Sequence, residues 1–101
     1  MSNETASAPV KHPEITAWPY EFPLSKPITV GQDTVQFLRL NEPTAKEAFE
    51  YGLLTGLAAD QVRGLVAALA VTPPPVIDKI PAADIIQLAA RLSRFFNAAA
   101  A

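Results

Sequence analysis

The sequence has no cysteine and only one histidine, and both shortages exclude chemistry. Without cysteine, the chain cannot form a disulfide, a thiolate nucleophile or a cysteine-ligated zinc or iron–sulfur site. One histidine, His12, cannot supply a multi-histidine metal site. Basic residues are also few, since eight Lys and Arg stand against ten Asp and Glu, for a net charge of −2. That sign opposes a bulk electrostatic attraction to nucleic acid or to anionic lipid.

Long apolar runs are missing as well. The longest uncharged stretch, residues 64–77, is interrupted by Thr72 and three prolines. It therefore falls short of the roughly 20 apolar residues that a membrane span needs. The first residues, Met1–Thr5, have neither a basic start nor an apolar core, so we expect no signal peptide and a soluble cytosolic protein.

The apolar content that is present suits one small folded domain. Half of the 101 residues are apolar and 18% are charged, which is typical of a folding chain rather than a disordered one. Residues 1–17 are polar and small, so we expect a flexible N-terminal tail there. Residues 98–101 are alanines, for which we expect a frayed end. The sequence thus predicts a single small domain over residues 18–97.

The first half of this domain reads as a β-hairpin. Large apolar residues occupy even positions from Trp18 and Tyr20 to Val30, the alternation of a strand with one buried face. Prolines occupy odd positions in the same stretch, so they remove N–H donors from one edge only, and the stretch is an edge strand. A second strand follows at 34–40, with Val35 and Phe37 predicted to face inward. We favour a four-residue loop, 31–34, because a shorter loop would place Pro27 in a hydrogen-bonded position.

The second half reads as three short helices packed on the hairpin, which makes the fold class α+β. Thr44 and Glu47 form a capping-box pattern at the start of a helix over about 45–54. A second helix covers about 59–71 and ends at the prolines, and residues 76–80 are expected to form one turn. The third helix, about 82–97, has an apolar stripe consisting of Ile85, Leu88, Ala89, Leu92 and Phe96. Asp84, Gln87, Arg91 and Arg94 are expected on the opposite face.

No group of residues points to catalysis, a cofactor or a metal, so we expect the protein not to be an enzyme. The single histidine lies in the expected tail, and the serines have no local base. A helix-turn-helix DNA-binding protein is an alternative that three short helices allow. In such a protein the N-terminal half of the recognition helix reads the bases. Here that half offers Asp84, Ile85, Ile86 and Gln87, while the basic residues lie at the far end, which argues against DNA and leaves protein–protein interaction as the favoured class.

Two sets of apolar residues are candidates for contact with a partner protein. Ile86 and Phe95 lie at the margins of the third helix's stripe, and together with Leu92 and Phe96 they could form a surface that a partner helix covers. The alternative is that these residues close a small core. Trp18 and Tyr20 form a second candidate set, for which the alternative is that they anchor the tail to the domain.

The order of the motifs is similar to that of a known family. Leu24–Gly31 matches the pattern L-x-x-P-I-x-V-G, and Leu40–Thr44 matches L-R-x-P-T except that Asn41 replaces the arginine. Asp84–Leu88 then opens a D-hydrophobic-x-x-L helix that ends in Phe95 and Phe96. Over residues 22–96 the chain resembles the small tail assembly chaperones of contractile-tailed phages and prophages. It departs from them in its proline-bearing N-terminal tail and in Pro73–Pro75.

The resemblance implies a phage tail assembly chaperone that has no enzymatic activity and no cofactor. Such chaperones bind the tape measure protein, a long helical chain that sets tail length, and keep it soluble in the host cytoplasm while the tail tube assembles. Tail tube subunits and further copies of the chaperone are also implied as partners, and the chaperone is absent from the finished virion. The alternative within the same biology is a small structural tail subunit that the virion retains.

Overall fold

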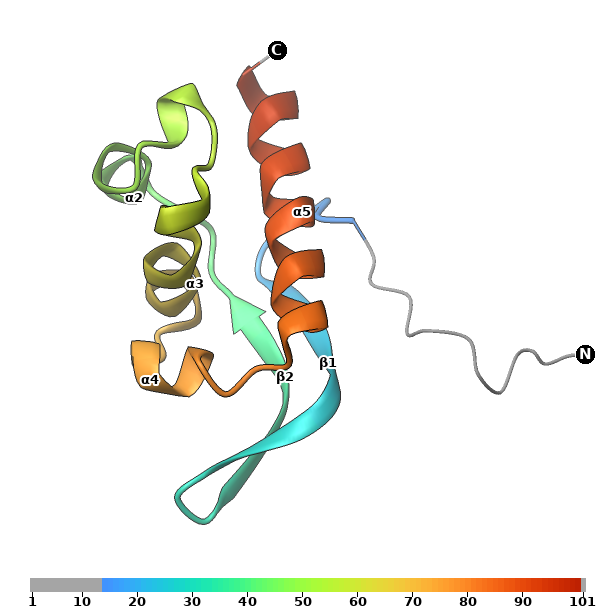
Figure 1. The fold of residues 1–101 in the computed structure, drawn as a ribbon. Helices are drawn as coiled ribbons and strands as arrows, with labels where there is room; N and C mark the ends of the chain where they lie inside the picture. Colours follow the sequence, from blue (N-terminus) through green and yellow to red (C-terminus); the bar gives the residue numbers. More distant parts are fainter. Residues whose placement is uncertain (1–13, 101) are drawn as a thin grey trace, which may run out of the picture.

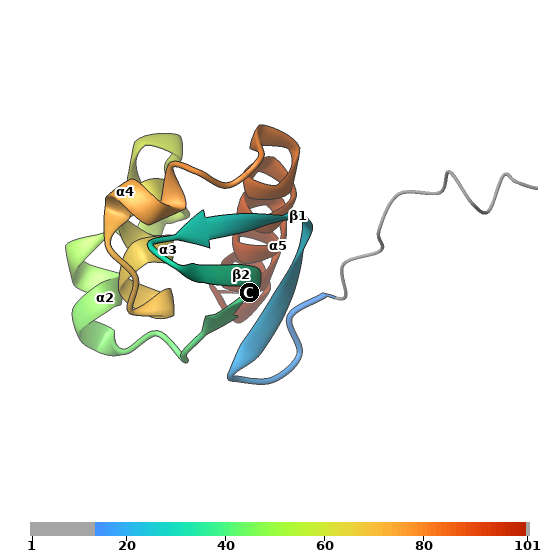
Figure 2. The ribbon, with the colours of Figure 1, turned by 90° about the horizontal axis from the view of Figure 1, so that it is seen from below.

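The structure is a computed structural model, and it describes residues 14–100. It contains a two-stranded antiparallel hairpin followed by helices, so the predicted α+β class is confirmed. In Figure 1, α2, α3 and α4 are grouped beside α5, and the hairpin extends below these helices; Figure 2 shows the same arrangement from below. The elements are β1 (Tyr20–Val30), β2 (Asp33–Leu40), α2 (Ala45–Glu50), the 3-10 helices η1 (Leu53–Thr55) and η2 (Ala59–Gln61), α3 (Val62–Ala70), α4 (Pro74–Ile77) and α5 (Ala82–Ala100). His12 and most of the expected tail lie outside the described residues.

The hairpin loop is two residues shorter than predicted. Val30 pairs with Asp33 instead of Val35, so only Gly31 and Gln32 form the loop. Gly31 has a φ of 62°, and it occupies the first loop position, where a two-residue hairpin loop accepts glycine readily. We had argued against a short loop because it would place Pro27 in a hydrogen-bonded position. With Val30 and Asp33 as the closing pair, the hydrogen-bonded positions of β1 are the even ones, so Pro27 is not required to donate.

An irregular stretch of β1 changes which side of β2 faces the core. Residues 24–27 stand opposite Gln36 alone, because the register shifts between the pairs Pro23–Phe37 and Ile28–Val35. Side chains alternate between the two faces of a strand. The three extra residues in β1 therefore change which alternate set of β2 side chains lies on the same face as the even residues of β1. On β1, the even apolar positions Tyr20, Phe22, Leu24 and Ile28 are buried as predicted, but on β2 the buried residues are Leu38 and Leu40. The prediction that Phe37 faces inward is wrong, since it is 50% exposed.

The helices differ from their predicted bounds mainly near glycine and proline. The first helix ends at Glu50 instead of about 54, because Gly52 adopts a left-handed φ of 66° before η1 begins. Helix α3 ends at Ala70, where Val71 adopts a left-handed φ of 50° before the prolines begin. Pro74 and Pro75 then occupy the first turn of α4, where a helix needs no N–H donor. Helix α5 runs through Ala100, past the predicted end at 97, so Ala98 and Ala99 are helical in the structure.

The core lies between the inner face of the hairpin and the helices. Its fully buried side chains come from both halves of the chain: Phe22, Leu40, Leu65, Val66, Leu69, Leu88 and Leu92. Ile15, which the sequence analysis placed in the tail, is only 8% exposed and belongs to this core. The folded domain therefore begins before the predicted boundary at residue 18.

Asp84 has a different position from the one we predicted. We expected it on the solvent-facing side of α5, but it is 3% exposed. Its Oδ2 atom accepts hydrogen bonds from the backbone N–H of Ser25, at 2.8 Å, and from the Ser25 hydroxyl, at 2.9 Å. Ser25 lies in the irregular stretch of β1, where pairing with β2 is interrupted. Asp84 thus supplies the acceptor that the interrupted ladder lacks, and it ties α5 to β1.

Candidate partner-binding surface

The six predicted contact residues do not form one surface. Leu92 is fully buried and Tyr20 is buried, so both are core residues rather than contact residues. Burial raises the pKa of the Tyr20 phenol. Ile86 is the most accessible of the six, with 66% of its surface exposed. Trp18, Phe95 and Phe96 are half-buried against the core. Ile86 therefore remains the best-exposed candidate from the original set.

The aromatic end of α5 is covered by the chain's own N-terminal segment. Trp18 packs edge-on against Phe95 with ring centroids 5.2 Å apart, and Phe95 packs against Phe96 at 5.5 Å. Beside them, the Arg94 guanidinium donates two hydrogen bonds, of 2.9 and 2.8 Å, to the carboxylate of Glu14. These bonds lower the pKa of Glu14 and raise that of Arg94. In the structure Trp18 has the anchoring role that we gave as the alternative to partner contact.

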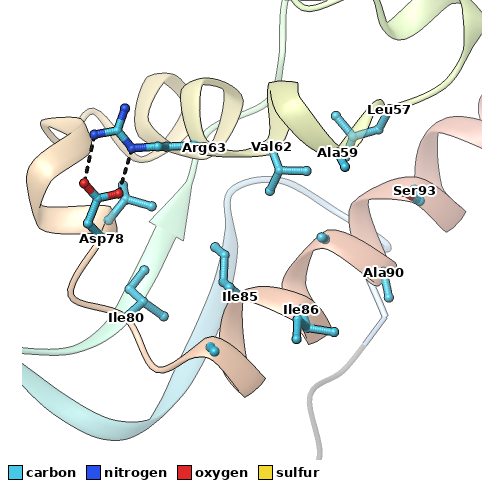
Figure 3. Close-up of a pocket in the computed structure, with 13 residues that line it drawn as sticks. Leu57, Ala59, Val62, Arg63, Asp78, Ile80, Ile85, Ile86, Ala90 and Ser93 are labelled. Carbon is cyan, nitrogen blue, oxygen red and sulfur yellow. Dashed lines mark hydrogen bonds and ion pairs between the residues drawn. The ribbon is translucent and has the colours of Figure 1, made fainter.

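An apolar groove of about 610 Å³ lies along the opposite flank of α5. We call it the α5 groove. Figure 3 shows Val62 of α3 and Ile85 of α5 pointing into the space between their two helices. The full lining consists of Leu57, Ala59, Val62, Arg63, Ile77, Asp78, Ile80, Ala82, Ile85, Ile86, Ala89, Ala90 and Ser93. Beside Ile85 and Ile86, α5 contributes alanines and a serine at helical spacing, so part of the groove is lined by small side chains that another backbone could approach closely.

The charged side chains at the α5 groove are paired with each other. Arg63 donates two hydrogen bonds to the Asp78 carboxylate, of 2.7 Å from Nε and 2.8 Å from Nη2. This pairing raises the pKa of Arg63 and lowers that of Asp78, in both cases mainly through the hydrogen bonds between them. Figure 3 shows the pair at one end of the groove. The remaining lining side chains carry no charge, which suits an apolar occupant.

A second, smaller groove of about 350 Å³ lies at the C-terminal end of α5, and we call it the aromatic groove. Its lining combines α5 with the region from Pro43 to η1: Pro43, Thr44, Ala45, Ala48, Leu53, Leu54, Phe95, Phe96 and Ala99. Leu54 and the nearby Phe49 are among the most exposed large apolar side chains of the described residues. Phe95 therefore belongs both to the Trp18 contact and to this groove.

The described residues offer no constellation for metal chemistry. They contain no group of three or more His, Cys, Asp or Glu side chains that could hold a metal ion. None of the helices among them combines the length and the apolar character that crossing a membrane requires.

Comparisons with protein-family models, with curated proteins and with solved structures found no match for this chain.

Sequence reasoning missed most of the α5 groove. The small residues Ala82, Ala89, Ala90 and Ser93 recur at helical spacing on the Ile86 flank of α5, and that pattern could have identified one wall. The opposite wall could not be found in this way. Leu57, Ala59 and Val62 line the groove only because η2 and α3 pack beside α5, which is a tertiary relation without a local sequence signal.

Proposed function

We propose that this protein is a phage tail assembly chaperone that binds the tape measure protein. The proposal joins two supports: the resemblance of residues 22–96 to that family, and the α5 groove with Ile86 exposed at its rim. The groove carries the argument, because an apolar groove along a helix, whose charged lining residues are paired with each other, fits the apolar stripe of another helix. The work of the chaperone is in the host cytoplasm, without a cofactor and without catalysis.

The proposed contact covers apolar surface on a helix that has not yet been packed into the tail tube. Apolar patches beyond a few hundred Å² promote association in solution, so a long amphipathic helix needs a partner until assembly. The alanines and the serine of the groove floor allow the bound helix to lie close to α5, and Ile86 and Val62 would contact its stripe. A single groove of this size binds only a short segment, so several chaperones act on one tape measure chain and leave it during assembly.

Co-expression tests this role. The tape measure protein of the same phage is expressed alone, with the wild-type protein, and with two variants. Ile86→Asp places a charge at the rim of the α5 groove, and we expect it to reduce the soluble tape measure severalfold, because a buried unpaired carboxylate opposes an apolar contact. Val71→Asp is the matched control: it adds the same charge at a site that is 78% exposed and outside both grooves, so soluble yield is expected to stay at the wild-type level.

Two results would contradict the proposal. One is a tape measure protein that is equally soluble without the chaperone. The other is equal rescue by wild-type protein and Ile86→Asp, provided that both have the same helical circular dichroism. Mass spectrometry of purified tails adds an independent measurement, because an assembly chaperone is absent from them and a structural tail subunit is present.

A further inference from the structure

Residues 14–19 are held to the domain by side chains alone. Within the described part of the chain, no backbone hydrogen bond joins this segment to a strand or helix. Its attachments are the Glu14 pair with Arg94, the burial of Ile15, and the edge-on contact of Trp18 with Phe95. The Arg91 guanidinium also lies near this segment, with its Nε 3.9 Å from the Glu14 carboxylate. We call residues 14–19 the strap.

The contacts that hold the strap exceed the entropy lost in ordering it by only a small margin. Each ordered residue loses backbone freedom, and the strap has two large apolar anchors and one ion pair to compensate for six such losses. The ion pair is half-exposed on both sides, so solvent screens it. Segments with few buried contacts and few backbone hydrogen bonds open at much lower free energy than the core. The strap therefore opens before the domain unfolds.

Opening the strap would enlarge the apolar surface at the end of α5. Trp18 covers Phe95, and Phe95 contacts Phe96, which lines the aromatic groove. Without the strap, the two phenylalanines are continuous with Leu54 and the rest of that groove. We propose that the strap is an autoinhibitory cover, which shields the aromatic end of α5 in the isolated protein and is displaced when a further apolar segment of the tape measure helix, beyond the one bound in the α5 groove, docks in the aromatic groove. The identity of the partner in this inference rests on the proposed function. The opening of the strap does not depend on it.

The chain contains one tryptophan, which makes the strap directly observable. Trp18 is the only source of tryptophan fluorescence, so its emission maximum and its quenching by acrylamide report the strap contact alone. Glu14→Ala removes the ion pair without adding charge, and Glu50→Ala is the matched control, an exposed glutamate on α2. We expect Glu14→Ala to shift the emission to longer wavelength and to increase quenching and binding of the apolar dye ANS about twofold or more. Glu50→Ala is expected to match the wild type in all three.

The opening must occur without unfolding. Far-ultraviolet circular dichroism and the urea midpoint of the helices are expected to differ little between Glu14→Ala and the wild type. Restoring the pair in reverse, with Glu14→Arg combined with Arg94→Glu, is expected to move Trp18 emission back toward the wild-type value. The inference is overturned if Trp18 emission does not respond to Glu14→Ala, or if it changes only in the same urea transition as the helices. These measurements use the isolated chain, so they can fail while the co-expression test succeeds.

A second experiment addresses the partner. In the co-expression assay, Glu14→Ala is expected to keep the tape measure protein soluble at a lower ratio of chaperone to tape measure than the wild type needs, because no binding free energy is spent on opening the strap. If an opened strap leaves this ratio unchanged or raises it, the cover is not autoinhibitory. A failure of the wild-type protein to solubilise the tape measure would instead contradict the proposed function itself.

Discussion

Replacing Asp84 is expected to destabilise the fold more than replacing any other polar side chain on α5. The Asp84 carboxylate accepts two hydrogen bonds from Ser25, at 2.8 and 2.9 Å, and it is almost completely buried. A hydrogen bond to a charged group contributes about 1.5–3 kcal/mol, and an unsatisfied buried donor costs about 1–3 kcal/mol. Ser25 itself is exposed, so water can reach its freed N–H and reduce that cost.

We therefore expect Asp84→Ala to lower the free energy of unfolding by about 2–3 kcal/mol. Ser25→Ala removes only the hydroxyl donor and keeps the backbone donor, so about 1 kcal/mol is expected. In a domain of this size, 1 kcal/mol corresponds to about 4–8 °C in Tm, which separates the two variants clearly. Asp84→Asn is the conservative control, since its amide oxygen still accepts from the Ser25 N–H, and it is expected to fall between them.

Urea denaturation followed by circular dichroism measures these differences, and the double variant completes a thermodynamic cycle. Because both single changes affect the same pair, their effects are expected to be less than additive. The reasoning is refuted if Asp84→Ala costs less than about 0.5 kcal/mol, as an ordinary surface change does. Strict additivity of the two substitutions would refute it equally, since the side chains would then not interact.

Three further outcomes follow from the same geometry. Leu92→Ala is expected to cost about 2–5 kcal/mol in urea denaturation, because its side chain is fully buried, whereas Ile86→Ala is expected to stay within about 0.5 kcal/mol; similar costs would contradict their different burial. Val71→Gly is expected to raise stability by about 1 kcal/mol, since Val71 holds a left-handed φ of 50° that disfavours a β-branched residue, and a lower Tm would contradict this. The Arg94 hydrogen bonds lower the pKa of Glu14 in the folded state, so the strap contact is fully present above about pH 4.3 and is lost as the pH falls through the lower folded value. Trp18 emission is expected to shift to longer wavelength over that acid range before the helices unfold. The groups that face Glu14 are Arg91, Arg94 and Tyr20. Glu14→Gln removes the carboxyl that titrates in this range, so it is expected to abolish the step.

Sequence reasoning succeeded where a pattern is local. The alternation from Tyr20 to Ile28 correctly predicted the buried face of β1, and the capping pattern correctly placed the start of α2, where Glu47 accepts from the Thr44 N–H at 2.8 Å. The fold class followed from the order of these elements.

It failed where the outcome depends on distant residues. The irregular stretch of β1 is stabilised by Asp84, 59 positions away from Ser25, and without that contact a regular register with Phe37 inward is the natural expectation. The burial of Leu92 and the position of the strap also depend on contacts with residues that are distant in the sequence. A helical stripe shows which residues are apolar, but it does not show that residues 14–19 cover one margin of α5 while the other margin stays open.

The two flanks of α5 are therefore unequal for a physical reason. On one flank, large side chains from α5 meet large side chains from elsewhere in the chain, as Phe95 meets Trp18, and the surface is closed. On the other flank, α5 presents Ala89, Ala90 and Ser93, which are too small to reach Leu57 and Val62 across the α5 groove. A domain selected for stability alone would gain from a larger residue there, because a filled groove buries more apolar area. The small residues keep the groove open at the expense of stability, which is expected if the partner that we propose occupies it.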